Sequence, residues 1–278
     1  MARIASLMVN IAESNSDSLA DKELMNQAIQ VLDQIFVGQL LVEVSQNPFN
    51  PKQWQFIFTD TVTAFLYYRL LTLLLNPLSI QGGLSLAKAD DDVHFYQTAL
   101  HYSNQALEQV EIFEAGDFLY NANFFEDMIT NALLTAWARL RQLRSPLQAN
   151  LAFLYEMHLP LYLEGKLTPT DWQTRQLTEF FHFKANHPLI GASLAKVKLN
   201  LQAAKTTQWL DIYHDVDKEA FYLTGLYRKG YSTAIAKMTG MTRQNIDYHL
   251  QSGHIAAERH QAAAIVMQLN REQTALLL

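Results

Sequence analysis

The segment with the clearest chemical meaning spans residues 232–251 and reads STAIAKMTGMTRQNIDYHLQ. A helix-turn-helix needs a small residue where its two helices cross, a glycine at the turn four positions later, and an apolar residue six positions after that glycine. Ala236, Gly240 and Ile246 occupy these three positions, and Thr242 is placed to cap the second helix. The spacing therefore predicts a helix-turn-helix.

The second helix of this motif would present polar side chains that hydrogen-bond base edges and phosphates, so double-stranded DNA is the expected partner. Between Arg228 and Gln261 the chain has five Lys or Arg and two Asp or Glu, whereas its overall net charge is −6. A local positive charge on an acidic protein suits a module that binds phosphates. The residues expected to contact DNA are Thr242, Arg243, Gln244, Asn245, Tyr248 and His249, together with Lys229 and Lys237.

Other groups of reactive side chains favour structural roles. Asp90, Asp91 and Asp92 precede a helical pattern and are typical of a helix N-terminus. His214 and Asp215 form a dipeptide similar to that of metal-dependent phosphohydrolases, but further ligands are not identifiable, so a surface pair is favoured. The absence of cysteine excludes a thiolate nucleophile and every zinc site that needs Cys. No metal and no cofactor is expected.

Composition favours a globular cytoplasmic protein. The chain has 278 residues, of which 49% are hydrophobic and 17% charged, and the lack of cysteine is compatible with a reducing compartment. The first residues lack the length and cleavage pattern of a signal peptide. The most apolar stretch, 56–78, contains Asp60, Arg69 and Asn76, so it is interpreted as core and no membrane partner is expected.

The first third of the chain mixes strand-like and helical patterns. This order predicts an α+β domain over 1–115, a ferredoxin-like sandwich with helices on one face of a mostly antiparallel sheet. The expected strands are 4–11, 40–44, 54–59 and 78–86, and the expected helices are 20–36, 62–75 and 93–109.

From Phe124 onward the spacing is helical, which predicts a helical region over 116–215 and a helix-turn-helix domain over 216–278. Further helices are expected within 146–163, 169–184 and 189–214, and the aromatic-rich helices between 118 and 184 could line a pocket for a small-molecule ligand. One apolar stripe comprises Phe125, Met128, Ile129, Ala132, Leu133, Ala136 and Leu140.

Residues 9–14 read VNIAES, residues 59–66 read TDTVTAFL, and a strand with two glycines follows at 78–86. With these elements in this order, residues 1–115 and about 220–265 together resemble a divergent member of the SatD family of bacterial proteins. In that family the first strand ends in a Gly-Asp-x-x-Asp-Ser pattern, which corresponds here to residues 9–14. A Gly-Asp-Glu-Phe-Gln-Gly-Leu-Leu element corresponds to residues 59–66, TDTVTAFL. The Gly-rich strand resembles 78–86, the following helix resembles 99–108, and a C-terminal helix-turn-helix is also a family feature.

This resemblance implies an N-terminal domain similar to class III nucleotide cyclases, in which carboxylates from the first strand and a hairpin hold metal ions on a triphosphate. Here the matching positions are degenerate, because Asn10 is neutral and Thr61 replaces an acid, which leaves Glu13 and Asp60. We therefore expect a non-catalytic sensor or dimerisation domain, with Asn10 and Asp60 close together at strand ends.

These observations favour a DNA-binding transcriptional regulator that is not an enzyme and acts as a homodimer, since one weakly positive module binds DNA weakly. Two alternatives stay open. One is a divergent enzyme of the nucleotide-cyclase type, which would need a second acidic ligand near Asp60. The other is a protein-interaction module with a structural helix-turn-helix, which would bury Arg243 and Gln244.

Overall fold

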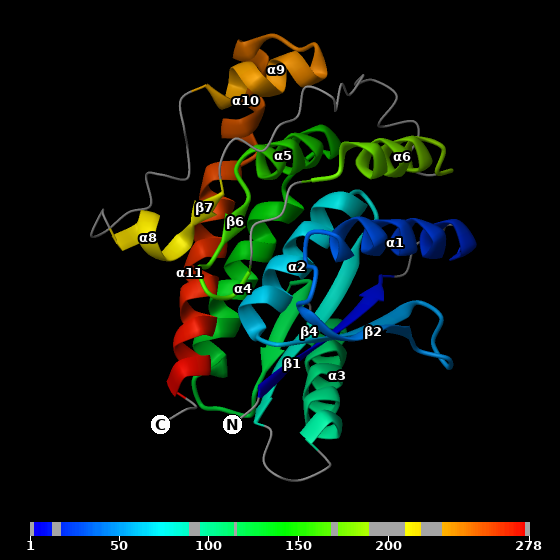
Figure 1. Ribbon diagram of the computed structural model, residues 1–278, viewed down its shortest axis with the longest axis vertical. Helices are drawn as coiled ribbons and strands as arrows, with labels where there is room; N and C mark the ends of the chain where they lie inside the picture. Colours follow the sequence, from blue (N-terminus) through cyan, green and yellow to red (C-terminus); the bar gives the residue numbers. More distant parts are fainter. Residues whose placement is uncertain are drawn as a thin grey trace.

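The computed structural model describes residues 3–12, 18–88, 95–113, 116–167, 172–188, 209–217 and 230–275 (Figure 1). It is a mixed α+β structure whose sheet lies at one end and whose C-terminal half is mainly helical. One large cluster of buried apolar residues contains side chains from all three expected domains, for example Leu7, Leu154 and Ile265. The elements of the N-terminal half are β1 (Arg3–Ile11), α1 (Ser18–Asp33), β2 (Leu40–Gln46), β3 (Gln53–Phe58), α2 (Thr61–Leu75), β4 (Ile80–Lys88), α3 (Phe95–Phe113) and β5 (Phe118–Asn121).

The main sheet has five strands in the order β2-β3-β1-β4-β5. The central strand β1 is antiparallel to both β3 and β4, and β2 is antiparallel to β3, as the sequence predicts for most of the sheet. β5 was not expected, and it pairs parallel with β4 at the edge. Its four residues are too few for an alternating pattern to reveal a strand.

The two faces of the sheet carry different residues. Ala5, Leu7 and Val9 of β1 point into the main core, to which α1 and α2 also contribute. Ser6 points the other way, and its hydroxyl lies 2.9 Å from that of Ser103 on α3. The expectation that the helices lie on one face is therefore wrong, because α3 covers the opposite face.

Small residues on β4 explain why α3 can lie on that face. A Cβ atom on Gly83 would lie 2.1 Å from the Ser103 carbonyl oxygen and 2.5 Å from the Leu107 nitrogen. Ser85 donates a hydrogen bond of 2.6 Å to the carbonyl of Ala99. Because the helix backbone approaches the strand this closely, only a residue without a side chain fits at position 83.

Helix α2 is the centre of the molecule. All of its residues except Thr72 are buried, so the apolar stretch 56–78 belongs to the core as expected. Its helical neighbours include α1, α5 and α11, and on its sheet side it contacts β1, β3 and β4. Within the described part of the chain, no helix is both long enough and apolar enough to cross a membrane.

The second half begins with α4 and ends with α11, a long helix that the sequence pattern did not predict. The expected helix over 189–214 falls mostly outside the described residues, which resume at 209. The elements are α4 (Asp127–Gln142), α5 (Pro146–His158), β6 (Leu161–Tyr162), α6 (Thr174–Ala185), β7 (Leu210–Asp211), α8 (Ile212–Asp217), α9 (Tyr231–Thr239), α10 (Arg243–Ser252) and α11 (Ile255–Ala275).

Most of the apolar stripe of α4 and the preceding turn faces outward. The buried positions of this helix are Thr130, Leu134, Trp137 and Ala138. By contrast, Phe125 is 88% exposed. The helix carries apolar residues on two sides, and the larger Trp137 packs into the core with Phe65 and Phe118.

We predict that Gly83→Ala destabilises the protein by roughly 1–3 kcal/mol or more, because the added methyl group would overlap the backbone of α3. Urea denaturation followed by circular dichroism measures the change. Ser45→Ala, on the exposed side of the edge strand β2, is the control and should alter the free energy of unfolding by no more than about 0.5 kcal/mol. Equal stability of Gly83→Ala and the parent protein would contradict the close approach of α3.

Candidate functional site

Helices α9 and α10 are joined by the tight turn that the sequence predicts. Gly240 ends α9 with a φ of 69°, and its backbone N–H donates to the carbonyl of Ala236. The left-handed conformation favours glycine at this position. Thr242 then begins α10, with its hydroxyl accepting a hydrogen bond of 3.3 Å from the backbone N–H of Asn245. Local interactions within ten residues, 236–245, therefore set the turn.

A small core fixes the two helices against each other and against the rest of the protein. Ile235 and Met238 of α9 are buried, as are Ile246 and Leu250 of α10. Both helices pack on α5, and α10 also contacts α11. The orientation of α10 is thus set by the C-terminal helices and not by the sheet.

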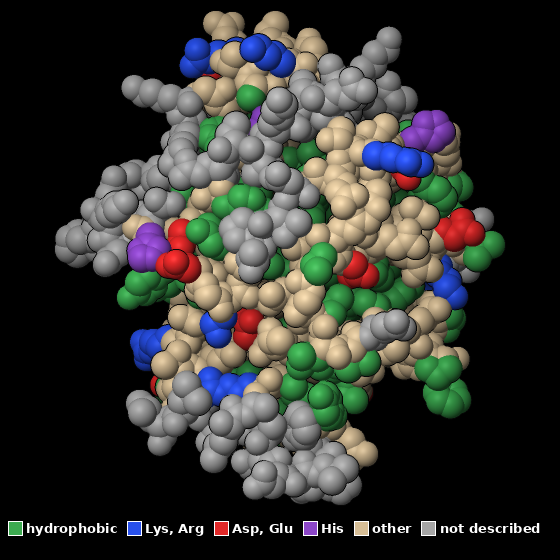
Figure 2. Space-filling view, in the orientation of Figure 1, with side chains coloured by type: hydrophobic (Ala, Val, Ile, Leu, Met, Phe, Trp, Pro, Cys, Tyr) green, Lys and Arg blue, Asp and Glu red, His purple; other side chains and the backbone are tan. Residues whose placement is uncertain are grey.

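The side chains expected to contact DNA lie on the outer side of this helix pair. Arg243, Gln244 and Asn245 are exposed, Tyr248 is 64% exposed, and His249 is half-buried. Thr242 is exposed, and so is Lys237 on α9. Lys229 lies outside the described residues. α9 and α10 form the tip of the molecule at the end away from the sheet, and Figure 2 shows Lys and Arg side chains there.

The described residues of this tip carry few exposed charges. Arg259 and Glu258, both included in the sequence count, are buried within the protein, and because their charges are opposite they leave the net count unchanged. Among residues 230–252 the exposed or half-buried charges are Lys237, Arg243 and Asp247. Arg243 lies 3.6 Å from Asp247 on the same helix, so its charge is partly compensated.

The degenerate metal positions do not come together. Asn10 pairs with Gln53 at the start of β3, whereas Asp60 follows the other end of β3, where Phe58 pairs with Ala5. The expectation that Asn10 and Asp60 are neighbours is therefore wrong, because the antiparallel register places them at opposite ends of the strands. Glu13 lies outside the described residues.

Asp60 instead has a structural role as the N-cap of α2. One carboxylate oxygen accepts a hydrogen bond of 2.9 Å from the backbone N–H of Thr63, and the other accepts from the hydroxyls of Thr63 and Thr59. A carboxylate at a helix N-terminus satisfies free backbone donors and interacts favourably with the helix dipole. These contacts occupy both oxygens of Asp60.

A buried network of ionised groups links α2 to the C-terminal helices. Arg69 of α2 donates hydrogen bonds of 2.7 Å to Glu156 of α5 and 2.7 and 2.8 Å to Glu258 of α11. Arg259 also pairs with Glu156, and the indole of Trp137 donates to Glu258 at 2.6 Å. All five side chains are almost completely buried.

These contacts decide the protonation of the network. Burial alone would raise the pKa of Glu258, but Arg69, Arg144 and Trp137 more than offset it and hold the pKa well below its usual range. Burial alone would lower the pKa of Arg69, and the two glutamates together raise it. Arg69 and Glu258 are therefore ionised at neutral pH.

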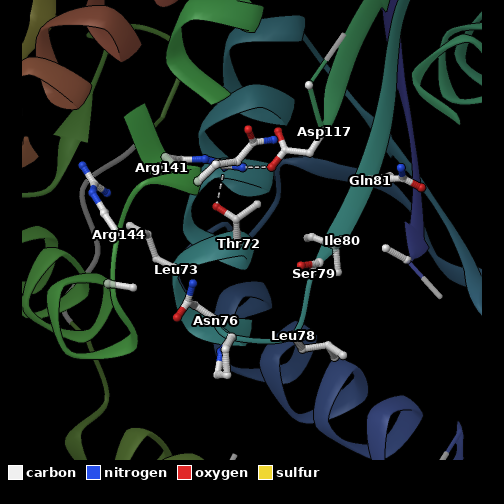
Figure 3. Close-up of a pocket in the computed structure, with 15 residues that line it drawn as sticks. Thr72, Leu73, Asn76, Leu78, Ser79, Ile80, Gln81, Asp117, Arg141 and Arg144 are labelled. Carbon is white, nitrogen blue, oxygen red and sulfur yellow. Dashed lines mark hydrogen bonds and ion pairs between the residues drawn. The ribbon is translucent and has the colours of Figure 1, made fainter. Parts of the chain in front are cut away.

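A cavity of about 250 Å³ lies beside this network, where the end of α2, the start of β4 and α4 meet. Figure 3 shows Arg141, Thr72 and Asp117 pointing toward one another at its edge. Arg141 pairs with Asp117, donates to Thr72 at 2.8 Å and stacks 3.8 Å from the ring of Trp137. The lining of this cavity contains polar and aliphatic side chains, whereas Tyr120 and Phe124, from the aromatic-rich region that the sequence singles out, line another cavity of about 220 Å³.

Glu164, Asp211 and His214 form the cluster of potential metal ligands in the described part of the chain. The parallel strands β6 and β7 end side by side. Glu164, which follows β6, therefore lies close to Asp211 and to the start of α8. His214 lies 2.5 Å from Glu164, and Asp211 accepts hydrogen bonds from the backbone of α8. At the surface His214 therefore pairs with Glu164. The side chain of Asp215, which the sequence analysis paired with His214, lies outside the described residues.

We predict that Arg69→Met lowers the stability at pH 7 by about 3–5 kcal/mol, because it leaves two buried carboxylates without their shared cation. The pKa of Glu258 is lowered in the folded protein, so the network stabilises above the ordinary carboxyl pKa and this stabilisation is lost as the pH falls below about 4. The difference between variant and parent should therefore shrink toward pH 3, as measured by urea denaturation at both pH values.

Arg175→Met is the matched control, because Arg175 forms an exposed pair with Glu179 on α6 and should leave the stability unchanged. A difference for Arg69→Met that is small, or the same at pH 7 and pH 3, would rule out the ionised network as a major source of stability.

Comparisons with known proteins identify no relative of this chain. No family model, no curated protein and no solved structure matches it. The resemblance to the SatD family stays a prediction from the sequence. The function must therefore be argued from the geometry of the chain itself.

Proposed function

We propose that this protein is a cytoplasmic DNA-binding regulator in which α9 and α10 form a helix-turn-helix and α10 is the recognition helix. The observation that carries the proposal is the division of α10 into two sides. Ile246 and Leu250 are buried, whereas Arg243, Gln244 and Asn245 are exposed at its N-terminal end. Residues at that end of a recognition helix contact base edges in the major groove.

The exposure of these residues favours DNA binding over a structural helix-turn-helix. A purely structural corner would bury Arg243 and Gln244, and both are exposed. Thr242 and Lys237 flank the same surface, where hydroxyl and ammonium groups suit phosphate contacts. Because Asp247 partly compensates the charge of Arg243, this surface keeps only a weak positive charge. One copy of the protein would therefore bind DNA weakly, and the proposal includes a homodimer.

For the N-terminal domain we propose a ferredoxin-like fold with a non-catalytic role as a sensor or dimerisation domain. The succession β1-α1-β2-β3-α2-β4 and the strand order β2-β3-β1-β4 support this fold. The separation of Asn10 from Asp60 and the capping role of Asp60 favour this role over a nucleotide-cyclase-type enzyme. The cavity beside Arg141 is the place we assign to a small-molecule ligand.

We predict that Arg243→Ala and Lys237→Ala weaken DNA binding in different ways. Arg243→Ala should cost roughly 1–3 kcal/mol on a specific site and relax its sequence preference, because it removes contacts to base edges. Lys237→Ala should weaken binding to all sequences alike and reduce the slope of affinity against salt by about one unit. Electrophoretic mobility shifts with genomic fragments at several salt concentrations measure both effects.

Arg175→Ala on α6 serves as the control, because it removes an exposed arginine far from α10 in the sequence. Binding by Arg243→Ala that equals that of the parent protein on every fragment would contradict the assignment of α10. Absence of any shift with the parent protein at low salt would instead favour the interaction-module alternative.

A further inference from the structure

The cavity of about 220 Å³ lies where the end of β5, the segment before α4 and the end of α11 meet. Its described lining consists of Tyr120, Phe124, Glu126, Glu272 and Ala275. Two aromatic rings and two carboxylates thus surround one space, and this described lining includes no lysine, arginine or histidine. Carboxylates and the faces of aromatic rings both attract a positive charge.

Glu272 of α11 is the most buried carboxylate of this lining, with 7% of its surface exposed. Its Oε1 atom accepts hydrogen bonds from the hydroxyl of Thr130 and, at 2.8 Å, from the amide of Gln268. Burial raises the pKa of Glu272, the charge of Asp127 adds to this, and the neutral donors offset it only in part. These donors position the carboxylate without balancing its charge.

Two further carboxylates, Glu126 and Asp127, stand at the start of α4. Asp127 accepts hydrogen bonds of 2.9 and 3.1 Å from the backbone of Ala122 and Phe124 with one oxygen, and its other oxygen is buried without a partner. Glu126 makes no capping hydrogen bond. Within the described residues, none of the salt bridges involves any of these three carboxylates. The negative charge at the cavity is therefore not balanced by the described part of the chain.

Tyr120 adds a buried hydroxyl to the same wall. Its side chain belongs to a residue that is 2% exposed, and burial together with the charges of Glu272 and Asp127 raises its pKa. The hydroxyl nevertheless makes no hydrogen bond of ordinary geometry. A buried polar group without a partner costs free energy, so its place in a cavity wall indicates a ligand that completes its hydrogen bonding.

The size and lining of the cavity favour an organic cation over a metal ion. In the described part of the chain, ligand atoms close enough to share a metal ion gather at Glu164, Asp211 and His214, not here. A space of 220 Å³ equals the volume of about seven water molecules, which is more than a bare ion fills. Phe124 is 47% exposed, so its ring is open to a bound molecule.

We propose that this cavity binds a small primary amine in its protonated form. The ammonium group lies between Glu126 and Glu272, and the aliphatic chain lies against the two aromatic rings. An ammonium carries three N–H donors, which match two carboxylates and the oxygen of the Tyr120 hydroxyl. This site is separate from the cavity beside Arg141 and does not depend on the proposed DNA binding.

The probe is n-butylammonium, titrated into the full chain at low salt and followed by saturation-transfer NMR. We expect saturable binding with a dissociation constant of roughly 0.1–10 mM, the range open to so small a ligand. 1-Butanol has the same shape without the charge, and tetramethylammonium has the charge without N–H donors. Both should bind at least about tenfold more weakly, because each lacks one part of the charge-assisted hydrogen bonds.

Two pairs of variants locate the site. Glu126→Gln should weaken binding at least about tenfold, because it removes a charge and keeps the shape. Glu23→Gln, the same change at an exposed position of α1, is its matched control. Phe124→Ala should weaken binding about two- to fivefold through the lost cation–π contact. Phe125→Ala, at the next residue but outside the described lining, should leave the affinity unchanged.

Glu272→Gln distinguishes a binding role from a structural one. Glutamine keeps an oxygen that accepts from Thr130 and Gln268 and removes the buried charge, so the variant should resist urea at least as well as the parent protein. Its affinity for n-butylammonium should nevertheless fall at least about tenfold. A loss of stability with unchanged affinity would show a structural role and overturn the assignment.

Three further results would overturn the proposal. One is a parent protein that does not bind n-butylammonium at concentrations up to about 50 mM. Another is binding that Glu126→Gln leaves unchanged, or that 1-butanol or tetramethylammonium equals. The third is binding of Mg²⁺ that n-butylammonium does not displace, which would identify a metal site. Since no DNA is present, none of these results bears on the mobility shifts that test DNA binding.

Discussion

The buried ion network around Arg69 is the interaction on which the rest of the structure depends. It joins α2, the most buried helix, to Glu156 of α5 and to Glu258 of α11. Removing such charges from water costs several kcal/mol per ion, so the network persists only because each partner supplies charge-assisted hydrogen bonds. It joins α5 and α11 to α2, which packs on the sheet.

From this anchor the structure extends in two directions. On one side, the central strand β1 places Ala5, Leu7 and Val9 in the core and Ser6 against α3, so both faces of the sheet are covered. On the other side, α11 continues directly from α10 and carries Glu258 near its first turn. The orientation of α10 is therefore tied through α11 to a buried charge pair.

The same framework gives Asp60 a structural role. Asp60, the carboxylate that the family resemblance places at a metal site, stabilises the start of α2 through Thr59 and Thr63. The antiparallel register separates it from Asn10 along the full length of β3. The polar side of α10 and one apolar side of α4 are exposed in the described part of the structure.

The sequence by itself determined the features that depend on neighbours within a few residues. The Gly240 turn, the Thr242 cap and the strands β1 and β3 were all predicted, because local spacing and backbone preference set them. Tertiary structure decided the separation of Asn10 from Asp60, the position of α3, the parallel pairing of β5 and the outward face of α4. A periodic pattern shows that a helix has an apolar side but not which way that side points. That direction depends on contacts such as Trp137 with Glu258, which lie 121 residues apart and form only when the whole chain packs.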